Sequence, residues 1–72
     1  MITVKVFREL GNTPVQGKKV TVHTSTGSLS STTDRNGSAH FDLSGGKDYK
    51  VYVDGKQLYA GSIAGVQVIY VR

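Results

Sequence analysis

Apolar and polar residues alternate along almost the whole of this 72-residue chain, and turn-forming residues interrupt the alternation at short intervals. Successive side chains of a β-strand point to opposite faces, so this pattern predicts strands with one buried face. We find no segment with the apolar spacing of an amphipathic helix. Short strands separated by turns are typical of a sandwich or a barrel. We therefore expect a single all-β domain over residues 1–72.

About seven strands fit the alternation, and the prediction is a seven-stranded antiparallel Greek-key β-sandwich. The residues predicted to face the core are, strand by strand, Ile2, Val4 and Val6; Val20 and Val22; Ala39, Phe41 and Leu43; Tyr49, Val51 and Val53; and Val66, Val68 and Tyr70. In the last strand, Gln67, Ile69 and Val71 then face outward, but the sequence equally allows the inverted facing or a central strand covered on both sides. The polar segment 28–33 has Leu29 as its apolar anchor and is predicted to be a short edge strand.

Tight turns are expected where Asp, Asn and Gly cluster between the strands. The tetrad Asp34-Arg35-Asn36-Gly37 predicts one such turn, because Asn and Gly tolerate a positive φ and the Asp34 carboxylate can accept backbone hydrogen bonds. Asp54-Gly55 is a strong signal for a two-residue hairpin. The residues to which we assign structural roles in turns are Gly17, Asp34, Asn36, Gly37 and Gly55.

The turns and their flanking strands resemble the carboxypeptidase regulatory-like family, whose fold is a transthyretin-like, or prealbumin-like, β-sandwich. Pro14-Val15-Gln16-Gly17 before Val20 and Val22 is similar to the family's opening P-x-x-G turn and strand. Thr33-Asp34-Arg35-Asn36-Gly37, followed by Phe41 and Leu43, is similar to its T-D-x-x-G hairpin, and Gly46 with Tyr49, Val51 and Val53 to its G-x-x-Y strand. The resemblance spans residues 14–53 and implies a non-catalytic structural or docking role. This chain is shorter than usual for the family, whose domains usually accompany a larger host protein.

Composition excludes several classes of protein and favours binding over catalysis. The chain has no cysteine for a disulfide, and its small core favours help from a partner subunit. It has no apolar run near the roughly 20 residues of a membrane-spanning helix. Residues 1–8 alternate like a strand and lack the features of a secretory signal. We expect a cytoplasmic protein if the chain is full-length, and an extracellular one if it is excised from a longer exported protein.

No arrangement of residues indicates an enzyme, a metal site or a cofactor site. No serine lies in a nucleophile elbow, and no paired carboxylates are evident. Asp34 and Asn36 fit part of a calcium loop, but Leu43 stands where the loop needs a bidentate glutamate, so a hairpin turn explains them better. His23 and His40 would form a metal pair only if their strands were neighbours, and a third ligand is lacking.

Two surfaces remain as candidates for binding. The first is apolar: Phe7, Tyr52, Ile69 and Val71 fall on the outward phase of their strands and predict a docking surface for a protein partner or a second copy of the chain. The alternative is a basic, tyrosine-bearing face that binds an anionic polymer, such as nucleic acid, or a glycan, because nine Lys and Arg outnumber five Asp and Glu. The residues expected on that face are Lys5, His40, Lys50 and Tyr52.

Overall fold

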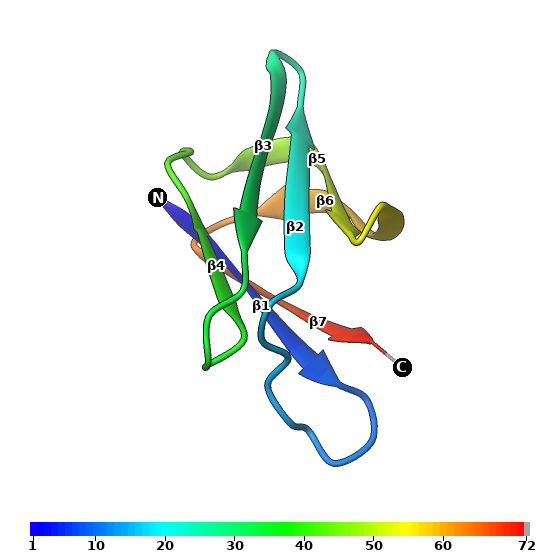
Figure 1. The fold of residues 1–72 in the computed structure, drawn as a ribbon. Helices are drawn as coiled ribbons and strands as arrows, with labels where there is room; N and C mark the ends of the chain where they lie inside the picture. Colours follow the sequence, from blue (N-terminus) through cyan, green and yellow to red (C-terminus); the bar gives the residue numbers. More distant parts are fainter. Residues whose placement is uncertain (72) are drawn as a thin grey trace.

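The computed structural model describes residues 1–71, which form seven strands and no helix (Figure 1). The all-β prediction is confirmed for this part of the chain. The strands are β1 (Ile2–Arg8), β2 (Lys19–Thr24), β3 (Gly27–Thr32), β4 (Ser38–Phe41), β5 (Gly46–Val53), β6 (Lys56–Ile63) and β7 (Val66–Val71).

The strands belong to two sheets. Strands β4, β1 and β7 form one sheet in that order, called here the β1 sheet, and β3, β2, β5 and β6 form the other, called the β2 sheet. The pairings within the β2 sheet are antiparallel, as is the pairing of β1 with β4.

One pairing differs from the predicted antiparallel arrangement, because β1 and β7 run parallel. The chain reaches β7 from β6, which lies in the other sheet, through the two residues Ala64 and Gly65. It enters the β1 sheet at the end where β1 begins, and there the Thr3 backbone N–H donates to the Gly65 carbonyl at 2.7 Å. A strand that starts beside the start of β1 must run in the same direction as β1.

The core lies between the two sheets and is built mainly from β-branched residues. Inward-facing residues alternate with outward-facing ones in β1, β2 and β5, as the sequence predicts. The buried apolar residues form one cluster: Ile2, Val4, Val6, Val15, Val20, Val22, Ala39, Phe41, Val51, Val53, Ile63 and Ile69. Because both sheets contribute to this cluster, the molecule is a two-layer sandwich of sheets.

Strand β7 adopts the inverted facing, which is one of the alternatives that its sequence leaves open. Ile69 is 5% exposed, whereas Val66 and Tyr70 are more than half exposed. The register explains the inversion, because Ile69 pairs with the inward-facing Val6, and Tyr70 pairs with the outward-facing Phe7. Paired residues of neighbouring strands lie on the same face of a sheet, so β1 dictates the facing of β7.

Leu29 does not anchor β3 in the core as predicted. It pairs with the buried Val22 and so lies on the inner face of the β2 sheet, yet it is 42% exposed. Strand β3 is the edge strand predicted from its polar sequence. The β1 sheet has three strands and the β2 sheet four, and Leu29 lies on an edge strand of the wider sheet.

The turn around Asp34 is held by its own carboxylate. Oδ1 of Asp34 accepts hydrogen bonds from the backbone N–H groups of Asn36 at 2.9 Å and Ser38 at 3.0 Å. These bonds are the main reason that the pKa of Asp34 lies below its ordinary value. The left-handed conformation falls on Gly37, with φ 77°, and Asn36 does not adopt it, contrary to expectation. One residue with positive φ is enough, because the carboxylate fixes the rest of the turn.

The other two predicted turn glycines also have a positive φ. Gly17 has φ 80°, and Gly55 has φ 83° directly after Asp54 with φ 51°. Two successive left-handed residues between antiparallel strands are the requirement of a tight hairpin, which Asp-Gly satisfies. This confirms the hairpin predicted between β5 and β6.

Candidate binding surfaces

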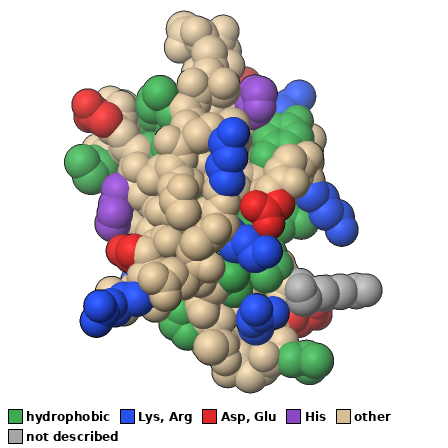
Figure 2. Space-filling model, in the orientation of Figure 1, with side chains coloured by type: hydrophobic (Ala, Val, Ile, Leu, Met, Phe, Trp, Pro, Cys, Tyr) green, Lys and Arg blue, Asp and Glu red, His purple; other side chains and the backbone are tan. Residues whose placement is uncertain are grey.

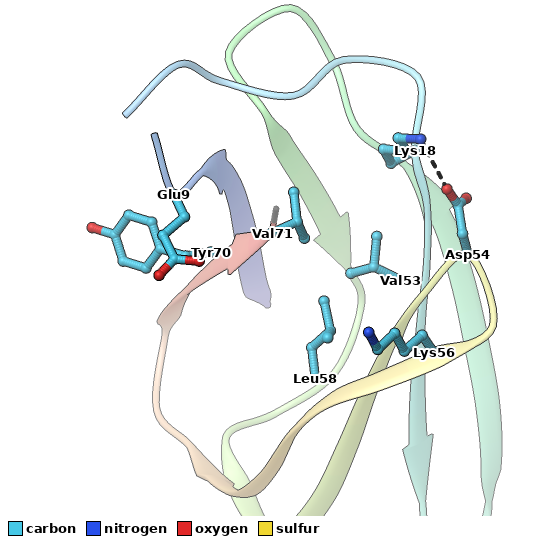
Figure 3. Close-up of a pocket in the computed structure, with 8 residues that line it drawn as sticks. All are labelled: Glu9, Lys18, Val53, Asp54, Lys56, Leu58, Tyr70 and Val71. Atoms are coloured by element: carbon cyan, nitrogen blue, oxygen red, sulfur yellow. Dashed lines mark ion pairs between the residues drawn. The ribbon is translucent and has the colours of Figure 1, made fainter. Parts of the chain in front are cut away.

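A pocket of about 580 Å³ lies at the end of the sandwich where β1 and β7 finish and where the β5–β6 hairpin turns (Figure 3). Both sheets line it. Its apolar floor consists of Val53, Leu58 and Val71, whose side chains point toward one another in Figure 3. Its rim is formed by Glu9, Lys18, Asp54, Lys56 and Tyr70. The sandwich therefore remains open at this end and exposes part of its apolar interior.

Two charged residues on the rim, Lys18 and Asp54, form an ion pair with each other. Lys18 Nζ lies 3.0 Å from Asp54 Oδ2, and the Lys19 backbone N–H donates to Asp54 Oδ1 at 3.4 Å. The hydrogen bond from Lys18 is the largest cause that lowers the pKa of Asp54 below its ordinary value. Asp54 thereby connects the β5–β6 hairpin to Lys18 and Lys19, where β2 begins.

Lys56 occupies an unusual position for a lysine, because it lies on the inner side of its sheet. It pairs with the buried Val53 across the hairpin but is itself exposed, and the half-buried Leu58 follows at a register shift between β5 and β6. In Figure 3 the Lys56 side chain extends toward Leu58 at the pocket. Within residues 1–71, Lys56 makes no ion pair. Sequence reasoning missed this residue, although the fixed register of an Asp-Gly hairpin could have placed it opposite Val53.

An apolar strip runs along the outer face of the β1 sheet. It consists of Phe7, Val66, Val68 and Tyr70, and we call it the β7 strip. Tyr70 packs against Phe7 with ring centroids 6.2 Å apart. Val66, Val68 and Tyr70 are 56%, 39% and 54% exposed, so most of the strip faces solvent.

The predicted docking surface does not form as a unit. Phe7 lies on the outer face of the β1 sheet, but Ile69 is in the core and Val71 packs against the core from the inner side. Tyr52 lies on the outer face of the other sheet, where it pairs with Thr21. The inverted facing of β7 replaces Ile69 and Val71 with Val66, Val68 and Tyr70 as the exposed apolar residues.

The predicted anionic-ligand face is also divided between the two sheets. Lys5 and His40 belong to the β1 sheet, where His40 Nδ1 and Thr3 Oγ1 share a hydrogen bond of 3.0 Å. Lys50 and Tyr52 belong to the β2 sheet. Alternation shows that a side chain faces outward, but a sandwich has two outer faces and the pattern does not distinguish them. On the face shown in Figure 2, basic side chains are scattered among acidic ones.

The histidine beside Lys50 and Tyr52 is His23, in place of the expected His40. His23 pairs with Lys50, and its ring meets the edge of Tyr52 at a centroid distance of 4.8 Å. The Tyr52 hydroxyl donates to Gln57 Oε1 at 3.2 Å. A hollow of about 400 Å³ lies over these side chains. Because His23 and His40 belong to different sheets, the two-histidine metal pair considered from the sequence does not form.

The described residues form neither a metal-binding cluster nor a membrane-spanning helix. Within residues 1–71, no group of three or more His, Asp or Glu side chains lies close enough to hold a metal ion. Every buried side-chain nitrogen or oxygen of that range has a hydrogen-bond partner. The same range forms no helix of the length and apolarity needed to cross a membrane.

Comparison of the chain with protein-family models, with curated proteins and with solved structures gave no match. The resemblance to the carboxypeptidase regulatory-like family therefore stays a prediction that rests on turn and core residues. Functional inference depends on the surfaces described above.

Proposed function

We propose that this chain is a non-catalytic protein-interaction module, a transthyretin-like Greek-key sandwich that associates with a second copy of itself through β7. The two-sheet arrangement and the Gly17 and Asp34 turns support this fold assignment. The observation that carries the functional proposal is the β7 strip. It combines exposed apolar side chains with a strand at the edge of a sheet.

Strand β7 lacks the features that discourage the other edge strands from pairing with another chain. Edge strands of monomeric proteins are usually short, charged or interrupted, which discourages pairing with other chains. Strand β4 is four residues long, β3 is rich in serine, and β6 begins with an inward-facing lysine. Residues 66–71 carry no charge, and the side of β7 away from β1 has no strand partner in the described chain. Such an edge is suited to strand addition.

A second copy fits this edge because β7 is compatible with itself. In an antiparallel pairing centred on Val68, Val66 of each copy would lie opposite Tyr70 of the other. No like charges would meet within the paired strands, and the apolar strips would extend across a continuous sheet. Pairing would also add buried surface to a molecule whose small core supplies limited stability.

The oligomeric state of Val68→Lys tests the proposal. The wild type should form dimers over a range of concentrations in light scattering coupled to size exclusion. Two lysines would face each other at the centre of the pairing, so the variant should weaken dimerisation by about a hundredfold. We choose Val68 over Ile69 because Ile69 is buried and its substitution would disturb the fold.

Leu29→Lys is the matched control, because Leu29 is also an exposed apolar residue on an edge strand but lies in the other sheet. It should leave the dimer intact, and circular dichroism should show that both variants are folded. A wild type that stays monomeric at all concentrations would overturn the proposal, as would an unchanged dimer in Val68→Lys.

The alternative prediction of a basic face for an anionic polymer or a glycan lacks the surface on which it was based. Its four residues lie on two faces of the sandwich, with Lys5 and His40 on one and Lys50 and Tyr52 on the other. We therefore do not carry this alternative into the proposal.

A further inference from the structure

The open end of the sandwich combines an apolar floor with an inward-facing cation, and this combination points to a ligand. Small-molecule sites are concave and mostly apolar, with a few polar groups that orient the ligand, and they span roughly 300–1,000 Å³. The pocket of about 580 Å³ between the ends of β7 and β5 lies within this range. It extends between the two layers, so a ligand there would contact both sheets (Figure 3).

The floor offers apolar surface that the fold itself leaves incompletely covered. Val53 is 6% exposed and belongs to the core cluster, while Leu58 and Val71 are half-buried and pack against it. Leu58 comes from one sheet and Val71 from the other. An apolar group placed between them would continue the core toward solvent, which is favourable because it removes this surface from water.

Among residues 1–71, the rim supplies one cation that has no ion pair within the fold. Lys18 is committed to Asp54 at 3.0 Å, but Lys56 has no ion pair among the described residues. The stem of Lys56 lies beside Leu58 on the inner side of β6, so its ammonium group lies at the boundary between the apolar floor and solvent. A carboxylate on the ligand would meet this ammonium while an apolar body covered the floor.

We propose that this pocket binds a small carboxylic acid with an apolar body, whose carboxylate pairs with Lys56 and whose body lies against Val53, Leu58 and Val71. The pocket adjoins the end of β7 at Tyr70 and Val71, but Lys56, Val53 and Leu58 belong to the other sheet, so this inference goes beyond the proposed self-association. An inward-pointing lysine can also simply protect an edge strand from aggregation. That role requires no ligand preference, whereas a binding site predicts one.

The test titrates isotope-labelled protein with octanoate, octanol and octylammonium below their micellar concentrations, with amide resonances as the readout. Octanoate should shift the amides of Val53, Leu58 and Val71. It should bind about twofold to fivefold more tightly than octanol, because an exposed ion pair adds a modest increment. Octylammonium should bind more weakly than octanol, since it places a cation beside Lys56.

The variant Lys56→Gln should bind octanoate and octanol equally. Lys47→Gln is the matched control, because Lys47 is an exposed lysine outside the pocket on β5, and it should keep the preference for octanoate. Equal binding of the three ligands to the wild type would overturn the proposal, as would a preference that survives in Lys56→Gln. Shifts confined to Val66 and Val68 would also overturn it. Val68→Lys should still bind octanoate. Binding at the pocket can therefore be tested whether or not the chain self-associates.

Discussion

At the scale of single residues, Gly37 shows how a local requirement and a tertiary one can coincide. Its positive φ belongs to the Asp34 turn, but a Cβ atom at this position would also lie 2.5 Å from the carbonyl oxygen of Val6. The Gly37 carbonyl in turn accepts a hydrogen bond from the Val6 N–H at 2.8 Å. The turn is thus packed directly against the backbone of the central strand β1.

We predict that Gly37→Ala lowers the free energy of unfolding by about 3 kcal/mol, because it adds a backbone clash to an unfavourable φ. Gly55→Ala should cost only about 1–2 kcal/mol, since Gly55 has a similar φ but open space where its Cβ would lie. Urea unfolding of both variants measures the difference. Equal losses would mean that the contact with Val6 contributes nothing.

At the scale of elements, β7 determines which apolar residues the molecule buries and which it displays. Its six residues are apolar except for Gln67, so the strand sequence contains two nearly equivalent faces. The parallel register with β1 selects the face that carries Ile69 for the core. The exposed face then becomes the β7 strip.

Alanine substitutions on β7 test this facing. Ile69→Ala should lower the free energy of unfolding by about 2–4 kcal/mol, because it leaves a cavity in the core. Val68→Ala should change the free energy of unfolding of the monomer by about 0.5 kcal/mol or less, as expected for an exposed position. Ile69→Ala is best measured in a protein that also carries Val68→Lys, so that dimerisation does not contribute to the free energy of unfolding. The reverse order of effects would contradict the register.

At the scale of the whole molecule, the Asp34 carboxylate links the stability of the sandwich to pH. Asp34 has a pKa below its ordinary value of 3.8, chiefly because its carboxylate accepts the Ser38 and Asn36 backbone N–H groups. A group whose pKa is lower in the folded state stabilises that state above its unfolded pKa. The contribution is lost as the pH falls through the lower, folded value.

We therefore expect the wild type to be more stable than Asp34→Asn at neutral pH. The difference should be constant down to about pH 5 and should shrink as the pH falls below about 4. Urea midpoints measured across this range test the prediction. Asp42→Asn serves as the control, because the exposed Asp42 side chain makes no hydrogen bond within the described residues. A wild-type advantage that persists undiminished at pH 2.5 would contradict this role of the carboxylate.

The sequence by itself determined the strands, the hairpin turns and much of the core. Alternation places Val4, Val20 and Val51 in the interior, because a strand with one apolar face has a single favourable orientation. Asp34 and Gly37 mark their turn through backbone requirements that act within a few residues. These features depend on local geometry, which the order of residues specifies directly.

The tertiary structure decided the direction of β7, the facing of Ile69, and the division of Lys5 and Lys50 between two outer faces. It also brought Lys56 beside the apolar floor formed by Val71 and Leu58. Each of these depends on which strands become neighbours and on which sheet each joins. Alternation has a period of two and shows only that successive side chains lie on opposite faces of a strand. It therefore cannot tell which face is buried when both faces are largely apolar, or which of the two sheets a strand joins.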